Sequence, residues 1–148
     1  MFYTMPRKKT KSKKEQPTVT QLKKKLDAIY SQYIRRKYSD YRGYCSCVTC
    51  GVSKHVKHMQ CGHYVPRTHL SLRYDERNTF PQCASCNVFQ KGRMDEYAIF
   101  LINKFGDSIL NELNIEKHKI TKNFPYEEKI RYYKEKLLDM PDVPEATS

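Results

Sequence analysis

Two four-residue turns, CVTC at residues 47–50 and CASC at residues 83–86, decide how this chain folds. In each turn two residues separate the cysteines, a gap that lets one tight turn present both thiolates to a single ion. Two such turns complete a tetrahedral site of the kind that Zn(II) prefers. We therefore expect one structural zinc ion, held by Cys47, Cys50, Cys83 and Cys86. Because four thiolates leave no open position on the metal, this site would stabilise the fold without taking part in catalysis.

Redox chemistry and disulfides are the alternatives for these cysteines. A redox Cys-x-x-Cys pair is typical of a thioredoxin-like βαβ context, which this sequence does not show. Disulfides are typical of secreted chains, and the basic N-terminus lacks the apolar segment of a secretory signal. Cys45 competes with Cys47 as a zinc ligand but has the poorer spacing. Cys61 is expected to pack as a small buried residue.

Length and charge limit the class of protein. The 148 residues fit one domain with tails, and no apolar run approaches the ~20 residues that a membrane span requires. The net charge of +12 is concentrated in residues 1–106, whereas residues 107–148 hold slightly more acidic than basic side chains. This asymmetry favours a polyanionic partner, most simply nucleic acid, although it also fits a solvated surface. We expect no membrane partner and a cytoplasmic rather than secreted protein.

The pattern of apolar residues predicts an α+β domain over residues 18–140. Residues 1–17 read as a disordered basic arm and residues 141–148 as a flexible tail. Helical spacing predicts helices over 18–38, 93–105, 108–113 and 125–139, with Thr18 or Thr20 as a cap and the second helix ending at Gly106. The first turn of the 93–105 helix could begin earlier, near Asn87. Two short strands are expected, near 59–65 and 79–82.

The segment between and after the cysteine turns carries a second pattern. It reads QCGHYVPR at residues 60–67, DERN at 75–78, CN at 86–87 and KGR at 91–93. His63 and Asn78 are 15 residues apart, and Asn87 follows after another 9. This order resembles the HNH, or ββα-metal, nuclease motif, in which a strand ends in His and Pro and Cys-x-x-Cys-Asn opens a helix. The resemblance implies a small ββα-metal core stapled by the zinc site and flanked by N- and C-terminal helices.

The chemistry of phosphodiester hydrolysis accounts for these residue types. A neutral imidazole can take a proton from water near physiological pH, so His63 is the candidate base. The Asn78 side-chain carbonyl is expected to accept the other imidazole N–H and hold the ring. Asn87 is the candidate ligand of a catalytic Mg(II) or Mn(II), and Arg67 the candidate phosphate clamp. Taken singly, Asn78 would be an ordinary turn residue and Asn87 an ordinary helix cap.

One position departs from that motif. HNH nucleases usually place an acidic or His metal ligand directly before the catalytic His, and here Gly62 occupies this position. Gln60 could supply an oxygen and His69 a nitrogen in its place. Alternatively, water and phosphate hold most of the metal's positions, as Mg(II) permits. A degenerate, inactive site is the remaining alternative.

A closer resemblance covers about residues 18–105. The blocks at residues 60–67, 72–78 and 82–87, with Gly92 and Tyr97, are similar to the NinG/Rap recombination proteins of lambdoid phages. That family shows a Gly-His pair, a Leu-Arg-aromatic stretch, and Cys-x-x-Cys-Asn followed by Gly. The resemblance implies an Mg(II)- or Mn(II)-dependent nuclease for branched DNA, such as D-loops and Holliday junctions, in phage recombination. A non-catalytic zinc module that binds DNA or a recombination partner is the alternative.

Basic residues outside the cysteine turns are candidates for DNA contacts. They lie on the 18–38 helix and in the central region, and they are Lys23, Lys24, Arg35, Arg36, Lys37, Arg73, Lys91 and Arg93. A plain solvated surface explains the helix residues equally well. The 18–38 or 125–139 helix could also join two copies in a homodimer. Tyrosines interleaved with these basic residues, including Tyr30, Tyr33 and Tyr41, could stack on unpaired bases, although such residues more often pack internally.

Overall fold

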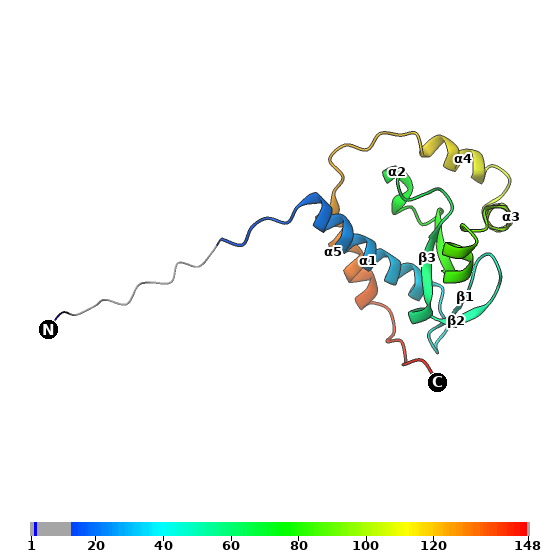
Figure 1. Cartoon of the computed structure of the whole chain (residues 1–148), viewed down its shortest axis with the longest axis horizontal. Helices are drawn as coiled ribbons and strands as arrows, with labels where there is room; N and C mark the ends of the chain where they lie inside the picture. Colours follow the sequence, from blue (N-terminus) through cyan, green and yellow to red (C-terminus); the bar gives the residue numbers. More distant parts are fainter. Residues whose placement is uncertain (1, 3–12, 148) are drawn as a thin grey trace.

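A computed structural model describes residue 2 and residues 13–147 of the chain, so most of the predicted basic arm lies outside the described residues. The described part is a mixed α and β fold, as the sequence predicts, and it contains two small antiparallel sheets (Figure 1). Its elements in chain order are α1 (Val19–Lys37), β1 (Tyr44–Ser46), β2 (Ser53–His55), η1 (Val56–His58), β3 (Met59–His63), α2 (Leu70–Arg73), β4 (Thr79–Cys83), η2 (Ser85–Phe89), α3 (Met94–Phe105), α4 (Ile109–Glu116) and α5 (Tyr126–Leu138).

The long helix α1 is capped and amphipathic, which confirms the prediction for residues 18–38 to within a residue at each end. Thr18 Oγ1 accepts the N–H of Gln21 at 3.2 Å, and Gln21 Oε1 accepts the N–H of Thr18 at 2.9 Å. This reciprocal capping box satisfies two backbone donors that a helix start leaves without partners. The apolar face then buries Leu26 and Ile34 against the rest of the chain.

Helix α5 covers the apolar face of α1, and the two pack side by side in the structure (Figure 1). Ile130 and Tyr133 of α5 join the buried cluster of α1, where the rings of Tyr30 and Tyr133 meet edge to face with centroids 5.0 Å apart. The predicted 125–139 helix is confirmed, with Pro125 at its N-terminal boundary. Helices α1 and α5 therefore bury their apolar faces against each other within one chain.

Strands β3 and β4 form the central antiparallel hairpin. Their register pairs Met59 with Cys83 at one end and His63 with Thr79 at the other. Every residue of β4 is buried, because α1 contacts it on one side and a cluster built on Phe80, Tyr97 and Leu101 lies on the other. The predicted strands 59–65 and 79–82 are confirmed, with β3 ending two residues earlier than expected.

Local backbone geometry explains where the remaining expectations differ from the structure. Helix α3 ends at Gly106 (φ 97°), as predicted, and α4 extends three residues beyond the predicted 108–113. The helix does not run on from Asn87, because Lys91 (φ 51°) and Arg93 (φ 45°) adopt left-handed conformations that separate η2 from α3. The strands β1 and β2 and the single turn of α2 are too short for periodicity to reveal.

The segment predicted to be a flexible tail is extended and lies against the body of the protein. The Pro141 carbonyl accepts Arg36 Nη2 at 2.7 Å, and the Pro144 carbonyl lies 2.8 Å from His55 Nε2. Val143 packs against the cluster that contains the buried cysteines. These contacts join the chain end to α1 and to the first cysteine turn.

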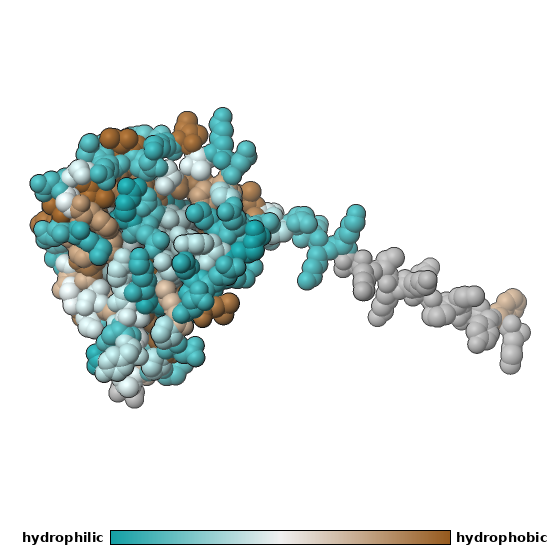
Figure 2. Space-filling view, turned by 180° about the vertical axis from the view of Figure 1, so that it is seen from behind, coloured by the Kyte–Doolittle hydropathy of each residue, from teal (hydrophilic) through white to brown (hydrophobic). Residues whose placement is uncertain are grey.

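The surface is largely hydrophilic on the face shown in Figure 2, with separate hydrophobic patches scattered over it. None of the described helices combines the length and the apolar character needed to cross a membrane.

We expect Leu26→Ala to lower the free energy of unfolding by ~2–5 kcal/mol, because Leu26 is fully buried between α1 and its neighbours and truncation leaves a cavity. Leu138→Ala is the matched control, since Leu138 is 84% exposed on α5 and should change stability little. Urea unfolding of both variants measures the difference. Equal effects from the two substitutions would contradict the described packing.

Candidate metal centre and active-site cleft

The four predicted zinc ligands come together in space. Their Sγ atoms all lie within 4.8 Å of one another, and those of Cys50 and Cys83 are 3.8 Å apart. Four sulfurs at about 2.3 Å from a tetrahedral zinc ion would be separated by about 3.8 Å, so the cluster has the dimensions of a zinc site. One pair is carried by the turn between β1 and β2, and the other by the junction of β4 and η2.

Hydrogen bonds favour the thiolate form at one member of this cluster, Cys47, whereas burial raises the pKa of Cys50 and of Cys83. Cys47 Sγ accepts the N–H of Cys83 at 3.3 Å and lies 3.4 Å from Thr49 Oγ1. Burial by itself would raise the pKa of Cys47, but these donors and nearby backbone N–H groups outweigh it and lower that pKa to about 6. Cys47 is therefore poised as a thiolate near neutral pH, the form that binds zinc.

The two remaining cysteines stand apart from the cluster of four. Burial raises the pKa of Cys45 to about 11 and that of Cys61 to about 12, which keeps both as neutral thiols. Cys61 packs against the α1 cluster, as predicted for a small apolar residue. The choice of Cys47 over Cys45, made on spacing, is confirmed by the positions of the sulfur atoms.

A cleft of about 800 Å³ lies beside the β3–β4 hairpin. Residues of α1 form one wall, and the loop after β3 and the connection from η2 to α3 form the others. Six of the residues singled out in the sequence line it: Gln60, His63, Arg67, Arg73, Asn87 and Lys91. The fold thus gathers most of the predicted constellation around one cavity with a basic lining.

His63 ends β3 with its imidazole half-buried in this cleft. Its Nε2 lies 2.8 Å from the carbonyl oxygen of Arg73, and because a carbonyl only accepts, Nε2 carries the proton in this contact. Nδ1 is then the ring nitrogen that can accept a proton. Burial lowers the pKa of His63, and the positive charges of Arg73 and Arg67 lower it further, against the opposing effect of the hydrogen bond. The ring is consequently neutral at pH 7.

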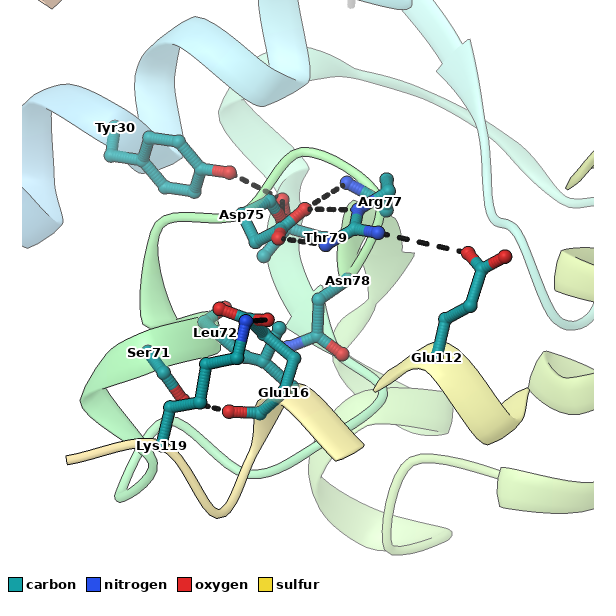
Figure 3. A network of polar contacts seen from close by, with 10 residues as sticks. All are labelled: Tyr30, Ser71, Leu72, Asp75, Arg77, Asn78, Thr79, Glu112, Glu116 and Lys119. Carbon is teal, nitrogen blue, oxygen red and sulfur yellow. Dashed lines mark hydrogen bonds and ion pairs between the residues drawn. The ribbon is translucent and has the colours of Figure 1, made fainter. Parts of the chain in front are cut away.

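Asn78 does not hold the imidazole, and that expectation is wrong. Asn78 is fully buried, its Oδ1 accepts the N–H of Val65 at 2.7 Å, and its Nδ2 donates to the carbonyls of Val65 and Leu72. Figure 3 shows this side chain beside Leu72, in the loop that leads from β3 to β4. Since Leu72 precedes Arg73, Asn78 fixes the loop whose backbone carbonyl orients His63.

A polar network from α1 supports the same loop. Arg73 donates to both carboxylate oxygens of Asp27, at 2.9 and 2.5 Å, and to the carbonyl of Arg67 at 2.8 Å. The Tyr74 hydroxyl also donates to Asp27, at 2.7 Å. Burial would raise the pKa of Asp27, but these donors and the arginine charges hold it below its usual value. Arg73 is therefore paired internally while it lines the cleft, and its predicted contact with DNA stays a prediction.

Sequence reasoning missed Asp27, which lines the cleft together with Tyr30. Asp27 interrupts the otherwise basic stretch of the predicted helix and lies one turn before Tyr30 on the same side. That spacing was the available signal. Tyr30 is buried and its hydroxyl lies 2.6 Å from Thr79 Oγ1, so it joins α1 to β4 (Figure 3).

Asn87 and Gln60 form the polar pair nearest to the zinc turns. Asn87 Nδ2 donates to Gln60 Oε1 at 2.7 Å, which leaves Asn87 Oδ1 as the amide oxygen suited to a cation. Asp27 is the sole carboxylate among the described residues that line the cleft, and it is tied to Arg73. A divalent ion bound here would therefore need water or phosphate for most of its ligands. His69 precedes α2 and is not among the lining residues.

Comparison with known proteins identifies the family. The model of the family described as bacteriophage lambda NinG protein matches residues 4–142. The chain belongs to the NinG family. Among curated relatives, protein ninG of Escherichia phage 933W is 31% identical over 103 residues, covering 66% of this chain and 48% of that protein. Protein ninG of Salmonella phage P22 is 29% identical over 124 residues, covering 80% of this chain and 57% of that protein.

This NinG-family chain spans about half the length of the curated relatives it matches. The ninG protein of Escherichia phage lambda gives a similar result, with 29% identity over 103 residues that cover 66% of this chain and 47% of that protein. No solved structure matches the chain.

Several basic side chains of this NinG-family member have internal partners. Arg35 Nη1 donates to the Val56 carbonyl at 2.6 Å, and Arg36 Nη2 donates to the Pro141 carbonyl at 2.7 Å. These bonds join α1 to η1 and to the C-terminal segment, so both guanidiniums have a structural role, and their predicted contact with DNA stays a prediction. Sequence could not show this, since both acceptors are backbone groups distant in the chain.

Other predicted DNA contacts keep charge at the surface. Lys37 pairs with Glu76 at 2.8 Å, and Arg93 pairs with Glu96 at 2.7 Å and approaches Cys86 Sγ at 3.9 Å. Lys24 is exposed and Lys23 half-buried on α1. Lys91 is exposed and lines the cleft, so it is the predicted cation best placed to meet a ligand there.

We expect Cys83→Ser to abolish binding of the single zinc ion and to unfold the domain, because zinc binding and folding are coupled in sites of this kind. Cys45→Ala is the matched control, since Cys45 is equally buried but lies outside the sulfur cluster. Metal content per chain and far-UV circular dichroism measure both effects. Zinc retained by Cys83→Ser, or lost from Cys45→Ala, would refute the ligand assignment.

Proposed function

We propose that this NinG-family chain is a metal-dependent DNA endonuclease whose active site is the cleft around His63. The observation that carries the proposal is the position of His63, whose Nε2 donates to a backbone carbonyl inside a cleft with a basic lining, which leaves Nδ1 as the ring nitrogen able to accept a proton. The lowered pKa of His63 favours the neutral imidazole that a general base requires. The order of β3, β4, η2 and α3 agrees with the ββα-metal core of HNH nucleases, which supports the same assignment.

In the proposed reaction His63 acts as general base. Its Nδ1 takes a proton from water as the water oxygen bonds to phosphorus and the bond from phosphorus to the 3′-oxygen breaks. The 3′-oxygen leaves with the bonding electron pair and takes a proton from solvent water, which yields a 3′-hydroxyl. Arg67 and Lys91 would hold the non-bridging phosphate oxygens, which carry growing negative charge. Asn87 Oδ1 would bind Mg(II) or Mn(II), which supplies Lewis-acid stabilisation of the phosphate and the departing oxygen. Arg73 and Asn78 act by fixing the loop that orients the base.

Branched DNA is the proposed substrate, on the strength of the likeness to the recombination proteins of lambdoid phages. D-loops and Holliday junctions are the forms implied, and work on phage DNA would take place in the host cytoplasm. A homodimer would suit the near-symmetric arms of a junction. α1 and α5 already cover each other's apolar faces within one chain, so other surfaces would have to join the two copies.

A non-catalytic DNA-binding module is the second candidate. It is favoured by the sparse donor set of the cleft, where Gly62 stands before His63 and Asp27 is bound by Arg73. The two functions differ in whether the cleft cuts the DNA that it binds.

We expect His63→Ala to lower Mg(II)- or Mn(II)-dependent cleavage by at least about 100-fold, the usual contribution of a general base, while DNA binding and zinc content are unchanged. The assay compares four-way junctions, flaps and linear duplex, with His118→Ala as control because His118 is exposed and outside the cleft. A wild-type protein that cuts none of these DNAs with either metal would contradict the endonuclease proposal and favour the non-catalytic DNA-binding module.

The acid limit of cleavage should lie below pH 6.5, the ordinary value for histidine, because burial and two arginines lower the pKa of His63. The base is active when neutral, so activity is full above this lowered pKa and falls as pH drops through it. Folding stability should begin to fall at higher pH than activity, as pH drops from about 6.5 towards the lowered pKa, because in that window the unfolded chain binds a proton that the folded chain does not. A pH profile of kcat/KM measures the limit. An acid limb centred above pH 7 would be inconsistent with this role for His63.

A further inference from the structure

The turn that follows Asn87 presents two apolar side chains to solvent. Phe89 is 81% exposed and Val88 is 56% exposed, and both belong to η2, the π-helical turn that contains Cys86. Asn87 precedes this pair and Lys91 follows it, and both of these residues line the cleft around His63. Phe89 itself is not a lining residue, but it lies two residues along the chain from each of these two.

Hydrogen bonds hold the backbone of this turn in place. The N–H of Gln90 donates to the Ser85 carbonyl at 2.9 Å, and the N–H of Gly92 donates to the Cys86 carbonyl at 2.7 Å. Buried Gln82 donates from Nε2 to the Gly92 carbonyl at 2.8 Å, which joins the turn to β4. Phe89 is thus exposed on an ordered turn anchored beside the cysteine cluster.

The backbone after Phe89 also adopts a strained conformation. Lys91 and Arg93 are both in the left-handed region, which costs free energy for residues other than glycine. Strain of this kind persists only where surrounding contacts enforce it, and it is found often at ligand sites. Its effect here is to end η2 sharply and leave Phe89 and Lys91 projecting, one ring and one cation two residues apart.

Other aromatic side chains differ from Phe89 in how their rings are placed. Tyr64 and Tyr74 line the cleft, but both are partly buried and their rings pack against those of Tyr97 and Tyr30. Tyr30 and Tyr33, which the sequence offered as base-stacking candidates, are buried against α5. Tyr41 is 87% exposed, but it does not line the cleft, and the Arg42 guanidinium already lies 5.9 Å from its ring centre. Phe89 is the exposed ring that lies next to the cleft's lining residues in the chain.

We propose that Phe89 stacks on an unpaired base of DNA bound in the cleft, so that the protein favours DNA with unpaired bases over fully paired duplex. This inference rests on the proposed function and adds a means of substrate choice to it. Aromatic rings stack on every base, because each base has a π face, and a neighbouring cation tracks the phosphates. In a fully paired duplex the base faces are already stacked, and opening them has an energetic cost.

The test measures binding without added Mg(II) or Mn(II), so that no cleavage is needed. The probes are a three-way fork with 2-aminopurine unpaired at the branch and a fully paired duplex of the same length. Phe89→Ala removes the ring, Phe89→Leu keeps an apolar side chain without a ring, and Phe89→Trp keeps a ring. Tyr41→Ala is the matched control for loss of an exposed aromatic. Zinc content and thermal unfolding confirm that each variant is folded.

We expect Phe89→Ala and Phe89→Leu to weaken fork binding about tenfold and to abolish the 2-aminopurine quenching seen with wild type. Phe89→Trp and Tyr41→Ala should behave as wild type, and duplex binding should change less than twofold in every variant. Equal losses on fork and duplex, full binding by Phe89→Leu, or no change with Phe89→Ala would overturn stacking. A wild-type dimer that Phe89→Ala converts to a monomer in sedimentation would also overturn it, because Phe89 would then be an interface residue.

Cleavage is measured separately on the same two DNAs. If wild type cuts neither DNA but its binding depends on the Phe89 ring, the endonuclease proposal fails and the stacking contact stands. If Phe89→Ala binds and cuts the fork as wild type does, the stacking contact fails and the endonuclease proposal stands.

Discussion

The cluster of four cysteines is the constraint on which the rest of the structure depends. It joins the β1–β2 turn to the end of β4, two places separated by more than thirty residues of chain. The second half of the cluster leads directly into Asn87, so the position of that side chain follows from the position of Cys86. A metal ion held there would fix one wall of the cleft before any ligand arrives. Domains of this size bury a limited core, which makes such a cross-link effective.

Helix α1 supplies the opposite wall of the cleft and is connected to the proposed general base, His63, through Arg73. Asp27 binds the Arg73 guanidinium, and the Arg73 carbonyl faces His63 Nε2. One arginine therefore connects the N-terminal helix to the imidazole through its side chain and its own backbone. Asn78 reinforces the same loop from within the core. Orientation of the proposed base depends on a folded loop supported from two sides, and not on a single partner side chain.

Sequence spacing predicted the parts of this site that depend on local geometry. The two-residue gap selected Cys47 and Cys83 correctly, and helical periodicity located α1, α3 and α5. Sequence spacing could not predict contacts to backbone carbonyls, because every residue type offers the same acceptor. For that reason the sequence does not reveal the bonds of Asn78 to the Val65 backbone or of Arg35 to the Val56 carbonyl. The His63 assignment itself depended on residue order, and the cleft brings His63 and Asn87 to one cavity.

The central claim is that the cleft between His63 and Asn87 receives a divalent ion together with DNA phosphate. The most direct measurement is paramagnetic line broadening by Mn(II) in the zinc-loaded protein, bound to a junction whose phosphates are replaced by cleavage-resistant phosphorothioates. We predict that the side-chain amide resonances of Asn87 and Gln60 broaden first, at Mn(II) levels well below one ion per chain. These resonances should broaden less when DNA is absent. Broadening that begins at other sites and leaves these two amides sharp would contradict the claim.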